Sequence, residues 1–154
     1  MASTPQNATS TGADPLLEHA EEVCRDRGVS FTPIRREVFE LLCRHDRPVG
    51  AYELLDELKA TRPRAAPVTV YRALDFLLEA GLAHKINALN AFTACRGSDQ
   101  SHKGLMLICS KCLHVIELED SKVENSIRRS AADRSFETRD EPVEVVGTCS
   151  DCRA

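Results

Sequence analysis

The residues of this sequence best suited to chemistry are two Cys-x-x-Cys pairs, Cys109 with Cys112 and Cys149 with Cys152. Zn²⁺ takes four soft or borderline ligands at tetrahedral corners, about 2.3 Å away when the ligand is thiolate sulfur. Two intervening residues let a tight turn direct both sulfurs of a pair at one ion. A single pair also fits a redox dithiol. Two pairs in a chain without secretory features predict a structural zinc site with four cysteine ligands.

The stretch between the two pairs, Leu113 to Thr148, is longer than the loops of small zinc-ribbon patterns. We therefore expect the ion to hold the end of a folded domain to an earlier strand. At 154 residues the chain has room for one medium domain or two small ones. Residues 1–15 are small and polar without an apolar run, which predicts a disordered tail and not a signal peptide or membrane helix. Seven cysteines without an export signal indicate a reducing, cytoplasmic location.

The net charge of −4 does not by itself suggest a nucleic-acid binder. Residues 31–86 nevertheless carry 9 basic and 8 acidic side chains, while residues 1–30 carry 2 and 5 and residues 87–154 carry 9 and 11. The middle segment is thus +1 between flanks of −3 and −2. A case for DNA binding must therefore depend on where the cations lie and not on their total.

Apolar residues at helical spacing predict four helices before Gly81. We expect the first over 16–27 with Gly28 as its stop, the second after an N-cap at Thr32, the third after Gly50 and the fourth from Pro67 to about Ala80. After Gly81 the period changes, and segments 82–86 and 91–94 predict two strands joined by a hairpin. Helices followed by such a hairpin form a winged helix-turn-helix.

The second half of the chain predicts a small α/β unit. A polar boundary at 96–103 is followed by strands at 105–109 and about 114–118, a helix at about 121–132 and a strand at 143–146. Fewer than 60 residues is a size at which a hydrophobic core needs help from a metal or a partner subunit. The predicted fold class is α+β, with a winged helix-turn-helix followed by this zinc-binding unit.

Three residues near the start of the fourth helix, Thr69, Tyr71 and Arg72, lie on faces that its apolar stripe does not use. In helix-turn-helix proteins, residues in the first turns of the second helix reach base edges in the major groove. Arg72 is suited to pair with a guanine, and Tyr71 to contact a thymine methyl group or a phosphate. An exposed ion pair of Arg72 with Asp75 explains the same pattern, so the residues alone leave both interpretations open.

Several of these segments together resemble the ferric-uptake-regulator family of metal-responsive repressors. They are the run Pro67-Val-Thr-Val-Tyr-Arg-Ala-Leu74, the preceding Thr32-Pro-x-Arg35 and the two cysteine pairs. The runs Gly50–Asp56 and Tyr71–Leu78 are most similar to its zinc-uptake-regulator branch. The resemblance covers about Leu16 to Cys152. It implies a winged-helix domain at 16–95, a hinge at 96–103 and a dimerisation and zinc-binding domain at 104–154.

The resemblance also implies two sets of functional residues. Zinc-sensing members of the family hold a sensory ion with residues that match His84, Cys95, His102 and Glu117 of this chain. Taken singly, these four fit ordinary roles: surface imidazoles, a buried thiol and a solvated acid. As a set they form a shell of two nitrogens, one sulfur and one oxygen that favours zinc. The expected DNA contacts are Thr69, Tyr71 and Arg72 on the fourth helix, Arg62 and Arg64 in the loop before it, and Arg35 and Tyr52 in the matching motifs.

The function implied is that of a cytoplasmic homodimeric repressor with two Zn²⁺ per subunit, one structural and one regulatory. The regulatory ion favours the dimer conformation that binds an inverted-repeat operator in double-stranded DNA and represses zinc-uptake genes. No enzyme activity, membrane partner or small-molecule substrate is expected. The alternatives are an iron- or peroxide-sensing repressor of the same family and a zinc hydrolase, the latter disfavoured because His-Glu-x-x-His is lacking.

Overall fold

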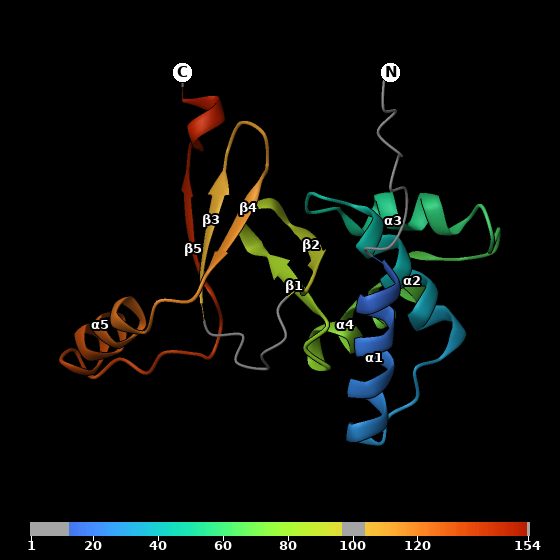
Figure 1. Ribbon diagram of the computed structural model, residues 1–154, viewed down its shortest axis with the longest axis horizontal. Helices are drawn as coiled ribbons and strands as arrows, with labels where there is room; N and C mark the ends of the chain where they lie inside the picture. The colour runs from blue at the N-terminus through green and yellow to red at the C-terminus, as the bar shows by residue number, and fades with distance from the viewer. Residues whose placement is uncertain (1–12, 97–103, 154) are drawn as a thin grey trace, which may run out of the picture.

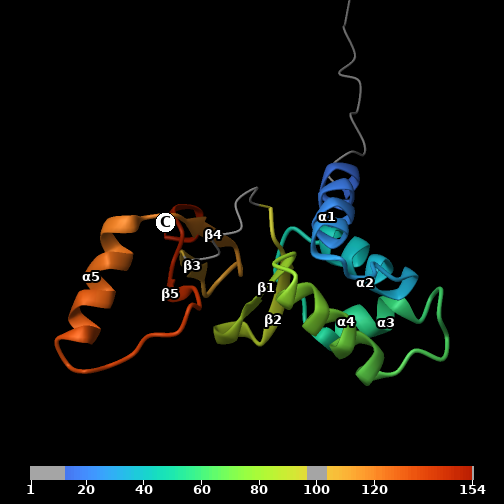
Figure 2. The ribbon, with the colours of Figure 1, turned by 90° about the horizontal axis from the view of Figure 1, so that it is seen from below.

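The computed structural model describes residues 13–96 and 104–153, and it confirms the predicted α+β class. Four helices gather at one end of the molecule, a three-stranded sheet and a fifth helix lie toward the other end, and a β-hairpin stands between them (Figure 1). The same division is seen after a quarter turn (Figure 2). No helix among the described residues is long and apolar enough to cross a membrane.

The helical part is held by one apolar core to which every helix contributes. At its centre, Phe39, Leu54 and Leu74 are almost completely buried. The N-cap at Thr32 is confirmed, since its side chain accepts a hydrogen bond from the backbone N–H of Arg35. The helices are α1 (Ala13–Arg27), α2 (Pro33–Arg44), α3 (Ala51–Leu58) and α4 (Pro67–Glu79).

Helix α1 begins three residues earlier than predicted, so residues 13–15 belong to the helix and not to the expected tail. Pro15 is compatible with that position because the first turn of a helix makes no intrahelical N–H bonds. Residues 1–12 lie outside the described residues. The stops at Gly28 and Gly81 are confirmed, with φ of +64° and +72°.

The predicted hairpin consists of β1 (Ala83–Ile86) and β2 (Ala91–Ala94), which pair antiparallel. A short 3-10 turn, η1 (Asn87–Leu89), connects them, and Asn90 closes it in the left-handed conformation. Phe92 pairs with Val49, which attaches the hairpin to the chain before α3. The hairpin therefore belongs to the winged helix-turn-helix.

The second half contains a sheet in the order β4-β3-β5, in which β5 runs parallel to β3. Its elements are β3 (Leu105–Cys109), β4 (Val115–Leu118), α5 (Ser121–Ala132), β5 (Val143–Gly147) and a final 3-10 turn, η2 (Ser150–Cys152). Helix α5 carries no buried residue. Among the described residues after 103, the buried ones are confined to 104–106, 108 and 109, so this half has very little core of its own.

The strand registers divide the sheet into two chemically different faces. One face carries two apolar rows, Leu118–Leu105–Val143 and Ile116–Leu107–Val145. Ile116, Leu118, Val143 and Val145 are 37 to 45 % exposed, so much of this face is open in the single chain. The other face presents the row Glu117–Met106–Glu144 and the buried Ile108, and it is turned toward the hairpin.

Candidate metal centres and nucleic-acid interface

The two Cys-x-x-Cys pairs meet at one end of the sheet because their strands are neighbours. β3 ends at Cys109, which lies in register with Gly147 at the end of β5. The backbone N–H of Ser110 donates to the carbonyl of Gly147 at 2.9 Å, which joins the two turns directly. Leu113 adopts a left-handed φ of 61° beyond the first pair, and η2 folds the second pair back on itself. The parallel β3–β5 pairing thus brings together cysteines that lie 40 residues apart in the sequence.

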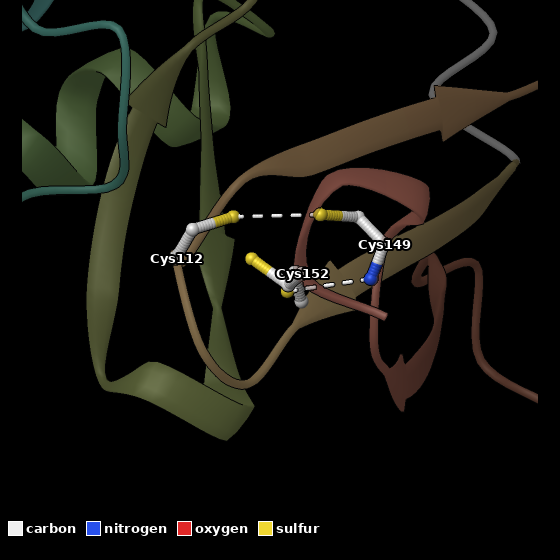
Figure 3. A group of neighbouring side chains, drawn as sticks. Cys112, Cys149 and Cys152 are labelled. Carbon is white, nitrogen blue, oxygen red and sulfur yellow. Dashed lines mark hydrogen bonds between the residues drawn. The ribbon is translucent and has the colours of Figure 1, made fainter. Parts of the chain in front are cut away.

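The four sulfurs form a cluster of the size that zinc requires. All four lie within 4.8 Å of one another. The sulfurs of Cys112 and Cys149 are 3.7 Å apart and point toward each other, with Cys152 beside them (Figure 3). Two thiolates at tetrahedral corners around one ion with 2.3 Å bonds are separated by about 3.8 Å. The cluster is therefore of the size and composition of a four-cysteine zinc site, and the separation of Cys112 and Cys149 matches it directly.

The thiols of this cluster do not titrate alike. Hydrogen bonds from the backbone N–H groups of Cys149 and then Cys112 lower the pKa of the Cys109 thiol to about 6. The side chains of Cys149 and Cys112 hydrogen-bond to the Cys152 thiol and raise its pKa to about 12. Cys109 is thus a thiolate near neutral pH, which is the form that binds metal. Completing a shell of four thiolates releases the remaining protons, so zinc affinity falls as the solution is acidified.

Of the second predicted set, the structure brings together two residues, His84 and Glu117, from the two halves of the molecule; among the described residues, Cys95 does not join them in a cluster of three ligand atoms within 4.8 Å. Nε2 of His84, on β1, lies 3.7 Å from Oε1 of Glu117, on β4, and the His84 side chain is only 6 % exposed. That distance is longer than a hydrogen bond and close to the spacing of about 3.4 Å between ligand atoms around a tetrahedral ion with 2.1 Å bonds. Both residues line a cavity of about 510 Å³ between the hairpin and the sheet. Cys95 is buried just beyond β2, and His102 lies outside the described residues.

Arg96, which follows Cys95, was not singled out from the sequence. Its guanidinium donates to the carbonyls of Cys43 and His45 at 3.3 and 3.4 Å, at the end of α2. Cationic donors are favourable at a helix C-terminus because they satisfy its last carbonyls. The segment that carries Cys95 is thereby attached directly to the helix-turn-helix.

The predicted DNA-contacting residues of α4 lie on its outer face. Arg72 is exposed, and Tyr71 is 40 % exposed. The Thr69 hydroxyl instead accepts a hydrogen bond from the backbone N–H of Ala66, at the start of the helix, so it has a capping role as well. Tyr52, on the neighbouring α3, is 65 % exposed.

The three predicted arginines outside α4 differ in how firmly other groups hold them. Arg35 stacks on the Phe76 ring, with its guanidinium carbon 3.8 Å from the ring centre, and donates to the carbonyl of Ser30. Nε of Arg62 donates to Glu37 at 2.6 Å. Arg64 is exposed in the loop before α4. The first two therefore have structural roles that compete with a contact to phosphate.

Comparison with known proteins places these sites in a family context. Residues 26–146 match the model of the ferric uptake regulator family. The chain is 41 % identical over 143 residues to the zinc uptake regulation protein of Escherichia coli K12, an alignment that covers 92 % of this chain and 84 % of that protein.

Two solved proteins of similar sequence match the structure closely. A zinc uptake regulator complexed with zinc and DNA superposes with a TM-score of 0.85 at 39 % identity, covering 93 % of this chain and 96 % of that one. Holo XcZur superposes with a TM-score of 0.80 at 39 % identity, covering 91 % and 98 %. Apo XcZur, at 38 % identity and 93 % and 99 % coverage, reaches only 0.55. The arrangement of the two halves described above is thus the one shared with the metal-loaded structures.

Proposed function

Because the chain belongs to the ferric uptake regulator family, we propose that it is a zinc-responsive transcriptional repressor and not an enzyme. Zinc is its metal, and double-stranded DNA is its partner. The observation that carries this proposal is the TM-score of 0.85 with a zinc uptake regulator bound to zinc and DNA. Since the match spans 93 % of the chain, it includes both halves and their mutual arrangement, and not the winged helix alone.

The four-cysteine cluster is proposed to be a structural zinc site. Zinc at this position would supply covalent-like links between four thiolates. Cys109 and Cys112 would then hold the end of β3 to Cys149 and Cys152 at the end of the described chain. These links would compensate for the small hydrophobic core of the second half.

His84, Cys95, His102 and Glu117 are proposed to hold a second, regulatory zinc in each subunit. His84 and Glu117 approach each other from the hairpin and from the sheet, so a shared ion would favour the arrangement in which these two elements are docked. A ligand shifts such an equilibrium only by its differential affinity for the two arrangements. Arg96 would link this zinc site to the end of α2, because its guanidinium hydrogen-bonds to carbonyls there.

A second copy of the chain is proposed to cover the open apolar face of the sheet, which carries Ile116, Leu118, Val143 and Val145. A two-fold symmetric dimer presents two α4 helices about one DNA turn, or a multiple of it, apart. Such a dimer matches an inverted-repeat operator. We place the protein in the cytoplasm, where its operator and its reduced thiols would be found.

The proposal is tested by measuring operator binding while a chelator buffer sets the free-zinc concentration. We expect the wild type to bind operator DNA only above a threshold of free zinc, and Cys95→Ala to retain its structural zinc and dimer but lose the response. A Cys95→Ala variant that switches at the wild-type concentration would remove Cys95 from the regulatory site. Parallel titrations with Fe²⁺ and Mn²⁺ and exposure to peroxide test the alternative signals within the family.

A further inference from the structure

The docked hairpin contacts one cross-sheet row of residues at three successive points. In the sheet registers, Met106 on β3 lies between Glu117 on β4 and Glu144 on β5. Neighbouring strands are about 4.8 Å apart, so the two carboxylate residues originate about 10 Å from each other. Glu117 approaches His84, and Met106 packs with the fully buried Ile86. Glu144 contacts the turn that follows Ile86 in the sequence.

The contact made by Glu144 is bidentate. Its Oε1 accepts a hydrogen bond from the backbone N–H of Asn87 at 2.6 Å, and its Oε2 accepts one from the N–H of Ala88 at 2.8 Å. Both N–H groups belong to η1, whose first amides have no partner within so short a turn. Hydrogen bonds to an ionised carboxylate are shorter and stronger than neutral ones. Glu144 is half-buried in this position.

The point of contact between the two ends of the row is apolar. Ile86, Met106 and Ile108 form a small core of their own, separate from the core of the helical half. Ile86 is thus a hairpin residue buried against the sheet and not against its own helices. An apolar contact of this kind is non-directional and permits rocking. The orientation of the hairpin therefore depends on what holds the two ends of the row.

We propose that Glu144 is a positioning residue that clamps the η1 turn to the sheet in the DNA-competent arrangement and thereby sets the free-zinc concentration at which the protein switches. The proposal rests on the function proposed above. The regulatory zinc ligands His84 and Glu117 define one end of the row, and the Glu144 clamp defines the other. Two fixed points on either side of Ile86 orient the hairpin, whereas with only one of them the hairpin can still rotate about that point.

The clamp acts on zinc affinity through the population of the docked arrangement. The apparent dissociation constant of a ligand equals its intrinsic value divided by the fraction of molecules in the competent arrangement. Glu144 raises that fraction before zinc arrives, because its contacts need no metal. Weakening the clamp therefore raises the free zinc required, while it leaves the structural zinc site and the DNA-contacting surface of α4 unchanged.

The test compares Glu144→Gln with Glu141→Gln as a matched control. Glutamine keeps the side-chain length but presents an NH2 group to one of the two backbone N–H donors. Glu141 lies three residues earlier, and its side chain is 63 % exposed and pairs only loosely with Arg139 at 3.9 Å. Each full-length protein is titrated with buffered free zinc against operator DNA, and hydrogen exchange is measured at the amides of Asn87 and Ala88.

For Glu144→Gln we expect the half-maximal free zinc to rise about tenfold, the size of effect produced by losing one charge-assisted hydrogen bond. Operator affinity at saturating zinc, structural zinc content and dimer mass should match the wild type. The amides of Asn87 and Ala88 should exchange faster, and Glu141→Gln should behave as wild type. A merely structural role for Glu144 would lower thermal stability or zinc content without moving the set-point.

The proposal is overturned if Glu144→Gln switches at the wild-type free-zinc concentration. Glu144→Asp keeps the charge on a shorter side chain, and we expect it to raise the half-maximal free zinc by a smaller factor. If the Gln variant misfolds, an Asp variant that switches at the wild-type free-zinc concentration overturns the proposal. A wild type that binds operator without regard to zinc would refute the proposed function instead. In that case unchanged amide exchange in Glu144→Gln would separately refute the clamp.

Discussion

Removal of one thiol of the proposed structural zinc site, Cys149→Ala, should unfold the second half of the molecule and leave the first half folded. Zinc bound to small domains contributes about 10–16 kcal/mol to their folding, which is comparable to the whole stability of about 5–15 kcal/mol of a typical protein. After residue 103, the buried apolar side chains of the described chain are Leu105, Met106, Ile108 and Cys109. At about 1.5–3 kcal/mol each, the side chains of Leu105, Met106 and Ile108 contribute about 5–9 kcal/mol together, which is less than the contribution of the ion, so they cannot compensate for its loss. The helical half keeps its own continuous core.

The assay combines zinc content, dimer mass and hydrogen exchange in the two halves. We expect Cys149→Ala to lose the structural zinc, dissociate into monomers and lose amide protection in β3 and β5, while α2 and α4 remain protected. Cys43→Ala is the matched control, because it also removes a thiol but lies 8 % exposed in the helical core. Burial raises the pKa of Cys43 to about 11, so this thiol is a poor metal ligand. The control should retain full zinc and dimer.

Two results would refute this reasoning. The first is a Cys149→Ala protein with wild-type dimer mass and unchanged protection in β3 and β5, which would mean that the cluster is not structural. The second is simultaneous loss of amide protection in both halves, which would mean that the helical half is not stably folded without the sheet. Removal of zinc by a strong chelator from the wild type should reproduce the variant, and addition of zinc should reverse it.

Three further outcomes are expected in the helical half. Arg72→Ala should cost about 1–3 kcal/mol on operator DNA and little on scrambled DNA; equal losses on both would make Arg72 a phosphate contact. Arg64→Ala should weaken binding to both DNAs and make its salt dependence shallower by about one counterion. Arg62→Ala should have smaller effects, because Glu37 already holds that guanidinium. A larger effect of Arg62→Ala than of Arg64→Ala in a salt titration would contradict this. The Thr61 hydroxyl and then Arg62 lower the pKa of Glu37, so its contribution to stability is present above about pH 4.3 and is lost as the pH falls through the lowered pKa. Glu37→Gln should remove that part of an acid-unfolding curve, and an unchanged curve would show that the pair does not stabilise the fold.

Local patterns in the sequence were sufficient to predict most elements of the fold and the clustering of the four cysteines. Helical spacing, the Thr32 cap and the stops at Gly28 and Gly81 depend on interactions within a few residues, so they can be inferred without the fold. The spacing of the cysteine pairs has the same character, because two residues between thiols already determine a turn. The start of α1 was missed because residues 1–15 are small and polar without an apolar run, so residues 13–15 carry no helical periodicity that would set them apart from the predicted tail.

The tertiary structure decided which side chains have partners far away in the sequence. Glu144 resembles any other acid in a strand, because its partners are backbone N–H groups 56 and 57 residues earlier, and backbone donors leave no trace in a side-chain pattern. Arg35 matches a family motif, yet only the packing of α2 against α4 shows that it stacks on Phe76. The proposed regulatory residues likewise had to be taken from the family resemblance, since His84 and Glu117 approach each other only when the hairpin docks on the sheet. The spacing of residues along the chain determines helices, caps and turns, whereas contacts between domains depend on how whole elements pack.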